Sequence, residues 1–218
     1  MATVTTRGWL LGLGLALVAT LVGGCGYFRP ADPEPPSGDI LIPNYETPED
    51  VLETLALAIS YKATGLTAYI GGFADTLTDP RAYHAFFDPA TLQKAIQNNW
   101  PIYDDWNRVR EEEFYGRLVK PEGVPTNSEF YLEWSPDPTQ GEDEPGTDRQ
   151  VLHREYLMFA TLTSGDDVTI AQGFATLEFV RVSPSRWVIV RWQDREDPTA
   201  VVSEGEVSMG YRRLDGSQ

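Results

Sequence analysis

Cysteine and positive charge are the scarcest chemical features of this chain. One of the 218 residues is a cysteine, Cys25, so no disulfide can form within the chain and stability must come from a hydrophobic core. Lysine and arginine together number 17 against 33 aspartates and glutamates, and this shortage of cations argues against nucleic acid as a partner. The two histidines, His84 and His153, stand far apart, so the sequence offers no zinc site.

Signatures of common cofactor and hydrolase sites are missing as well. The chain has no glycine-rich phosphate loop and no dinucleotide fingerprint, and none of its serines lies in a Gly-x-Ser-x-Gly motif. The acidic stretch from Pro136 to Asp148 lacks the alternating Asp-x-Asp pattern with glycine that wraps calcium. We therefore expect neither a cofactor nor a bound metal.

The apolar run near the N-terminus, Trp9 to Val22, is too short for a normal membrane span. It holds about 14 residues, whereas a helix that crosses the hydrocarbon core needs about 18 to 20. Arg7 precedes the run and Gly23 and Gly24 follow it, which is the order of charge, apolar core and small residues in a signal peptide. Residues 1–24 are therefore predicted to be a signal peptide.

The residue after the small pair is the cysteine, and it changes the expected processing. Leu21-Val22-Gly23-Gly24-Cys25 resembles the lipobox of bacterial lipoproteins, which implies a diacylglycerol on the Cys25 thiol, cleavage before it and a further acyl chain, such as palmitate, on the freed amine. Two or three chains anchor a protein firmly to a membrane. The alternative is an ordinary secretory signal with an incidental cysteine. Because Gly26 follows instead of aspartate, the resemblance favours the outer membrane over the inner membrane of the cell envelope.

Residues 25–46 are predicted to form an extended tether between the lipid and the folded domain. Few apolar residues occur here, and prolines interrupt the stretch at Pro30, Pro33, Pro35, Pro36 and Pro43. Removing the signal also removes Arg7, which leaves 16 lysines and arginines against 33 acidic residues, a formal charge of −17. We interpret this acidity as favouring solubility and repulsion from other envelope components.

The next part of the sequence has helical periodicity. Thr47 can cap a helix and Pro48 suits its first position, and apolar residues then recur at helical spacing as far as Lys62. Further segments are assigned from their patterns: a short helix over 67–74, a helix over 105–118, and an aromatic segment over 83–87 that fits either a short strand or a helical turn.

The second half of the chain changes to a period of two, which is typical of strands. The predicted strands are 129–134, 150–162, 169–182 and 187–192. Short polar connections separate the last three, which predicts antiparallel hairpins. Helices followed by a meander of strands indicate the α+β class.

Several of these segments together are similar to the NTF2-like (SnoaL-like) domains of envelope lipoproteins. The similar segments are Thr47-Pro48-Glu49-Asp50-Val51-Leu52, Tyr69 to Ala74, Trp106 to Glu113, and Trp187-Val188-Ile189-Val190-Arg191-Trp192-Gln193-Asp194. The resemblance implies that residues 47–218 form a cone, in which a curved antiparallel sheet wraps around an N-terminal helix with two further helices. It also implies a pocket for a small apolar ligand in the mouth of the cone, and dimerisation through the sheet.

The resemblance leaves two classes of function open, because isomerases, dehydratases and cyclases share this fold with proteins that have no known catalysis. An enzyme would need an acid or base inside the cone. Strand parity places His153 and Glu155 on one face, and Tyr69 is a candidate hydrogen-bond donor to an oxyanion. The opposing interpretation is that His153 and Glu155 are solvated, and it is favoured because charged residues are seldom buried.

The expected function is therefore non-enzymatic: a lipid-anchored module that binds a ligand or another protein, with an isomerase- or dehydratase-like enzyme as the alternative. Trp106, Trp134 and Trp192 are candidates for ligand contact, although large aromatic residues more often belong to the core. Asp194, at the end of the closing strand, is expected to cap a neighbouring element or to pair with an arginine such as Arg108 or Arg110.

Overall fold

The structure is a computed structural model that describes residues 41–75, 81–103, 105–196 and 207–215. Cys25, the predicted signal peptide and most of the predicted tether lie outside the described residues. The described residues belong to one compact unit that begins at Leu41. The last residues of the predicted tether are part of this unit. The hydroxyl of Tyr45 donates a hydrogen bond to the carbonyl of Ala68 at 2.8 Å, and its carbonyl accepts one from the Trp187 N–H at 2.7 Å.

The first helix, α2 (Pro48–Ser60), forms as the sequence predicts. Thr47 and Asp50 cap it reciprocally, each side chain accepting a hydrogen bond from the other residue's backbone N–H. Its apolar face is buried through Val51, Leu55 and Ile59, each with no exposed surface. The other helices of the described residues are η2 (Lys62–Gly65), α3 (Leu66–Gly71), α4 (Pro89–Gln97), α5 (Arg108–Leu118) and α6 (Met209–Asp215).

Some predicted boundaries shift for identifiable reasons. The helix predicted over 67–74 ends at Gly71, because Phe73 leaves the helix and pairs with Ile189. The helix predicted over 105–118 begins at Arg108, since the side chain of Asn107 caps it. Helices α4 and α6 were not expected.

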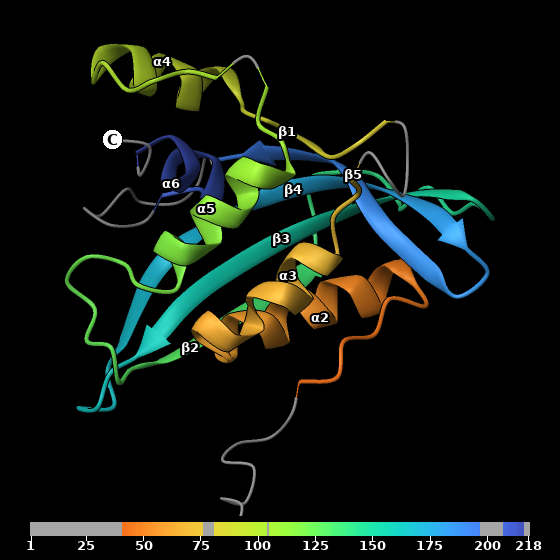
Figure 1. Cartoon of the computed structure of the whole chain (residues 1–218). Helices are drawn as coiled ribbons and strands as arrows, with labels where there is room; N and C mark the ends of the chain where they lie inside the picture. The colour runs from red at the N-terminus through yellow and green to blue at the C-terminus, as the bar shows by residue number, and fades with distance from the viewer. Residues whose placement is uncertain (1–40, 76–80, 104, 197–206, 216–218) are drawn as a thin grey trace, which may run out of the picture. The chain divides into compact units, whose positions relative to one another are not determined.

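The sheet has five strands, and Figure 1 shows that its longer strands are strongly curved. They are β1 (His84–Phe86), β2 (Glu129–Pro136), β3 (Arg149–Thr161), β4 (Asp167–Ser183) and β5 (Arg186–Arg195), and their order in the sheet is β1-β5-β4-β3-β2. Strands β2 to β5 are antiparallel neighbours, as predicted, but β1 runs parallel to β5. The sheet is therefore mixed, because β1 comes from the helical half of the chain and no hairpin joins it to β5. The α+β class, with a curved sheet against an N-terminal helix, is confirmed.

Strand parity divides the sheet into two faces. The inner face, against which α2 packs, carries the core side chains Phe130 and Leu132 of β2 and Tyr156, Met158 and Ala160 of β3. The outer face carries the alternate residues. No helix among the described residues is long and apolar enough to span a membrane.

Candidate functional site

The interior of the domain, between the inner face and helices α3, α5 and α6, contains a buried carboxylate. Glu111 projects from the first turn of α5 and has no exposed surface. It accepts hydrogen bonds from the Tyr69 hydroxyl at 2.9 Å, the Tyr83 hydroxyl at 3.2 Å and the Trp106 indole N–H at 2.8 Å. Three donors from different parts of the chain therefore fix the orientation of one carboxylate.

Arg213 of α6 completes this arrangement. Its Nε and Nη2 donate to the two oxygens of Glu111 at 3.0 and 2.8 Å, and neither side chain is exposed. The guanidinium carbon also lies 4.4 Å from the ring centre of Trp192 and 5.2 Å from that of Phe114. A bidentate ion pair flanked by aromatic rings thus occupies the interior; we call Glu111, Arg213, Tyr69, Tyr83 and Trp106 the polar centre.

The electrostatics of the polar centre keep its protons in place. Burial, reinforced by the negative charge of Glu111, raises the pKa of the Tyr69 and Tyr83 phenols well above the ordinary value. Burial opposes the charge of Arg213, but the attraction of Glu111 prevails and raises the pKa of the guanidinium well above its usual range. Tyr69 and Tyr83 are therefore hydrogen-bond donors at neutral pH, and Arg213 is a permanent cation.

A second buried carboxylate, Asp194, holds the start of α6. It accepts hydrogen bonds from the Tyr156 hydroxyl at 2.8 Å and from the Gly210 N–H at 2.7 Å, and Tyr156 in turn accepts from the Met209 N–H at 2.7 Å. Burial raises the pKa of Asp194, although Arg213 and these hydrogen bonds oppose the shift. Asp194 does cap a neighbouring element, as expected, and that element is α6.

The arginines expected to pair with Asp194 have other partners. Arg108 forms an ion pair with Asp75 at 2.8 Å, and the guanidinium of Arg110 lies 3.4 Å from the ring centre of Tyr103. Of the two alternatives, capping holds and pairing with Arg108 or Arg110 does not, because the arginine whose charge acts on Asp194 is Arg213 of α6.

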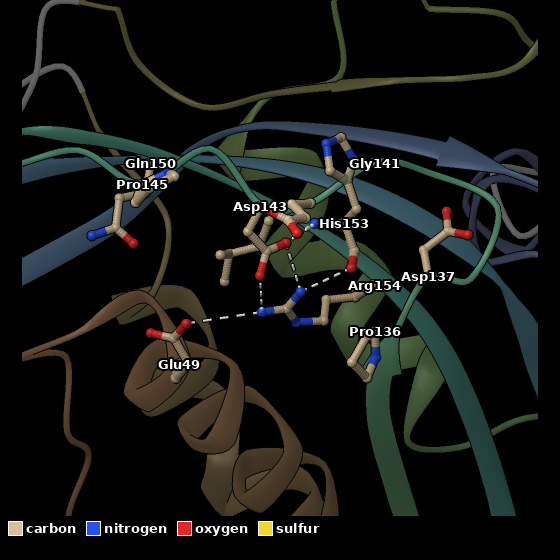
Figure 2. A pocket seen from close by; sticks show the side chains of 11 residues that line it. Glu49, Pro136, Asp137, Gly141, Asp143, Pro145, Gln150, His153 and Arg154 are labelled. Atoms are coloured by element: carbon tan, nitrogen blue, oxygen red, sulfur yellow. Dashed lines mark hydrogen bonds and ion pairs between the residues drawn. The ribbon is translucent and has the colours of Figure 1, made fainter.

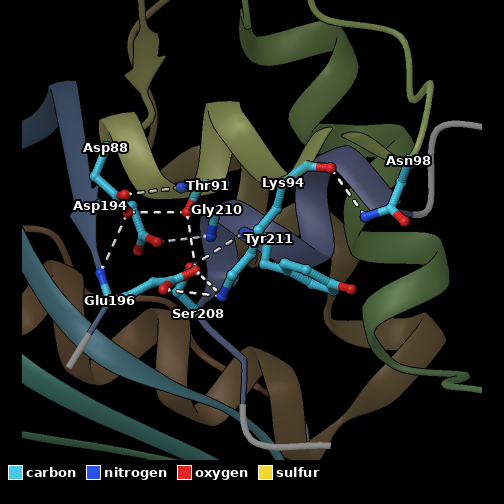
Figure 3. Close-up of polar contacts among 9 residues, drawn as sticks. All are labelled: Asp88, Thr91, Lys94, Asn98, Asp194, Glu196, Ser208, Gly210 and Tyr211. Carbon is cyan, nitrogen blue, oxygen red and sulfur yellow. Dashed lines mark hydrogen bonds and ion pairs between the residues drawn. The ribbon is translucent and has the colours of Figure 1, made fainter. Parts of the chain in front are cut away.

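Helix α4 and the end of β5 hold the outer side of α6, as Figure 3 shows. Lys94 of α4 forms an ion pair with Glu196 at 2.8 Å, and its ammonium lies 5.6 Å from the ring centre of Tyr211. The Tyr211 ring also meets Trp100 edge to face at 4.8 Å. These contacts are partly exposed, unlike those of the polar centre.

His153 and Glu155, the candidate acid-base pair, share one face of β3. That face is the outer one: in Figure 2, His153 points away from α2, whereas the intervening Arg154 points towards it. His153 Nδ1 lies 3.1 Å from the Thr176 hydroxyl, and Ser135 donates to Glu155 at 3.3 Å. Tyr69 lies inside the domain, so the structure does not bring the three candidates together.

A surface pocket of about 460 Å³ lies beside His153 (Figure 2). Arg154 donates to both oxygens of Asp143, at 2.8 and 2.9 Å, and its Nη2 lies 3.8 Å from Glu49. Partial burial tends to raise the pKa of Asp143, but the hydrogen bonds from Arg154 and from the His153 N–H lower it. Charged side chains line this pocket together with Pro136, Pro145 and Leu152, so its lining is a mixture of polar and apolar groups.

Two of the three candidate tryptophans belong to the core, and the third packs against it. Trp106 and Trp192 are almost fully buried; Trp106 is part of the polar centre, and Trp192 contacts Arg213. Trp134 packs against Trp192 with 5.7 Å between ring centres, and its indole N–H donates to the Leu52 carbonyl at 3.2 Å. Among the described residues, no group of three histidine, cysteine, aspartate or glutamate side chains could hold a metal ion.

The comparisons with known proteins give similarity in fold only. No model of a protein family and no curated protein matches the sequence. A protein of unknown function from Mycobacterium tuberculosis is 12% identical with a TM-score of 0.49, over 78% of this chain and 85% of that chain. An NTF2-like superfamily protein from Salmonella enterica is 13% identical with a TM-score of 0.44, over 72% and 92%.

A third solved structure, an NTF2-like protein with a cystatin-like fold from Novosphingobium aromaticivorans, is 9% identical with a TM-score of 0.44, over 70% of this chain and 80% of that chain. At these levels of identity no residue role is transferred from these proteins. The NTF2-like fold includes enzymes and non-enzymes, so the function has to be argued from the side chains.

Sequence reasoning missed Glu111 and Arg213. Glu111 stands first in a run of three glutamates, which resembles a solvated helix face. Its position three and four residues before the apolar Phe114 and Tyr115 was a usable signal, since those spacings share one face of a helix. No local pattern marks Arg213, because its partner lies 102 residues away.

Proposed function

We propose that this protein is a lipid-anchored cell-envelope protein whose NTF2-like domain works by binding and not by catalysis. The observation that carries the proposal is the polar centre: the interior, where an enzyme of this fold would hold its acid or base, is occupied by Glu111 and Arg213 with no exposed surface on either. Each of these charges neutralises the other, so neither is available to a substrate while α6 is docked.

The positions of the other candidate groups support the same proposal. A general base and an oxyanion donor must reach the same substrate within hydrogen-bond distance. His153 and Glu155 lie on the outer face, while Tyr69 is buried inside and donates to Glu111. An isomerase or dehydratase mechanism that combines them would need one substrate to contact both faces of the sheet at once.

The anchor is tested by Cys25→Ser in the full-length protein, expressed in a bacterium with an envelope that processes lipoproteins. We expect the wild type to sediment with outer membranes and to carry acyl chains by mass spectrometry, and the variant to lose both properties. A variant that still partitions with membranes and is still acylated would show that Cys25 is not the anchor.

For the binding partner, we propose a second copy of this chain on the outer face. Tyr131 of β2 and Phe159 of β3 stack there with 5.1 Å between ring centres, and Tyr131 is 39% exposed. Exposed aromatic rings on a sheet face are typical of interfaces. In sedimentation of the detergent-solubilised protein, we expect a dimer that Tyr131→Lys converts to a monomer. Glu112→Gln, at an exposed position on α5, should leave the protein dimeric. A monomeric wild type would contradict the dimer.

A further inference from the structure

Arg213, the cation of the polar centre, belongs to α6, which is the last described element of the chain. Helix α6 has seven residues and follows the sheet in the sequence, and none of its residues pairs with a strand of the sheet. A helix this short is not stable by itself in water. Its place depends on tertiary contacts. Met209, Gly210 and Arg213 make hydrogen bonds with Tyr156, Asp194 and Glu111. The side chains of Met209 and Leu214 are buried in the core.

We call Glu111 and its three donors the cradle for the guanidinium, and none of these four residues belongs to α6. Tyr69, Tyr83 and Trp106 all donate to Glu111, and they belong to parts of the chain that precede the sheet or its last strands. These three donors hold the carboxylate with its two oxygens turned to the fork of the guanidinium. A site that is oriented in advance binds its ligand at a lower entropic cost.

The shape and chemistry of the cradle select a guanidinium over other cations. Both Glu111 oxygens are engaged by a planar fork, which an ammonium cannot reproduce. The rings of Trp192 and Phe114, at 4.4 and 5.2 Å from the guanidinium carbon, suit a flat and weakly hydrated cation.

The fit of Arg213 is nevertheless incomplete. Its Nη1 is buried and has no hydrogen-bond partner among the described residues. A buried donor without an acceptor is unfavourable, so the contacts of Arg213 leave part of its desolvation cost uncompensated. Replacing a buried ion pair by apolar residues often stabilises a protein, which makes stability alone a poor account of this pair.

We propose that the interior is a guanidinium-binding site which the chain fills with its own Arg213, and that α6 is a displaceable plug of that site. The ligand class is a small organic cation that carries an alkylguanidinium group. This proposal concerns the interior alone and is independent of the lipid anchor and of the outer face.

The first test measures binding to the site once the plug's side chain is gone. In full-length Arg213→Ala, ethylguanidinium at ten times its Kd should raise the Tm by about 3–5 °C. Ethylammonium, which has the same charge but no planar fork of N–H donors, should leave the Tm of Arg213→Ala unchanged. Ethylguanidinium should leave the Tm of Glu111→Gln/Arg213→Ala unchanged. Arg212→Ala, which changes the adjacent arginine of α6, is the matched control and should respond no more than the wild type.

The second test needs no variant, so it holds even where Arg213→Ala does not fold. In native-state hydrogen exchange of the wild type, α6 amides should exchange about 100-fold faster than α5 amides, since a plug opens without global unfolding. Ethylguanidinium at its Kd for the open form should double the exchange rate of α6. The proposal is overturned if Arg213→Ala does not respond, responds equally to ethylammonium, or if α6 exchanges only as fast as α5.

Discussion

Glu111 and Arg213 form a bidentate ion pair across 102 residues of sequence, with both side chains fully buried. Removing either partner leaves the other as an uncompensated charge in a medium of low dielectric constant. The pair therefore couples the docking of α6 to the charge balance of the interior.

Glu111→Gln should destabilise the domain by about 3–5 kcal/mol, because the amide cannot neutralise the buried guanidinium of Arg213. Urea unfolding followed by tryptophan fluorescence measures this change. Glu112→Gln, an exposed neighbour on the same helix, should stay within about 0.5 kcal/mol of the wild type. In Glu111→Leu/Arg213→Met, which removes both charges, most of the stability should return; a double variant as unstable as Glu111→Gln would contradict this account.

Gly210→Ala should weaken the docking of α6, since a Cβ at this position would lie 2.7 Å from Oδ2 of Asp194. We expect a loss of about 1–3 kcal/mol in the free energy of unfolding. Gly116→Ala is the control: it lies in α5 with nothing within 4 Å of the added Cβ, and the change should stabilise the domain by about 0.5–1 kcal/mol. Equal effects of the two substitutions on the free energy of unfolding would mean that a Cβ close to Asp194 does not weaken the docking of α6.

Asp194 should give the stability a pH dependence of defined sign. Because burial raises its pKa in the folded state, the native protein binds more protons than the unfolded chain just above the unfolded pKa of about 4. Its contribution to stability is therefore complete at lower pH and is lost as the pH rises through the folded pKa. The advantage of the wild type over Asp194→Asn should shrink along this range in urea unfolding. The exposed Asp148→Asn should show no such trend, and an advantage that grows with pH would contradict the raised pKa.

Arg154 should hold the acidic loop against the open end of β3. It donates twice to Asp143 and once to the carbonyl of His153, so Arg154→Ala removes three charge-assisted hydrogen bonds. We expect faster cleavage between residues 137 and 148 in limited proteolysis by Glu-C. The free energy of unfolding should fall by about 1.5–3 kcal/mol. Arg181→Ala is an exposed control on β4 and should leave the cleavage rate unchanged. A wild-type rate in Arg154→Ala would show that other contacts hold the loop.

The sequence by itself determined the order and much of the extent of the elements other than α4 and α6. Thr47 and Asp50 predict the start of the first helix, because helix capping depends on residues close in sequence. The alternation in β3 predicts which side chains share a face, because the strand period is two. The α+β class follows from that order. The expected lipid anchor at Cys25 rests on the sequence alone.

Only the tertiary structure decided what each face and each charge meets. Periodicity places His153 and Glu155 together but cannot say that their face is the outer one, and it gives no reason for β1 to run parallel to β5. In the sequence Glu111 resembles one of three solvated glutamates, and only the fold shows that it is buried in an ion pair with Arg213. Local patterns record hydrogen bonds and burial within a few residues, whereas the partner of a buried charge is set by which distant segments the fold brings into contact.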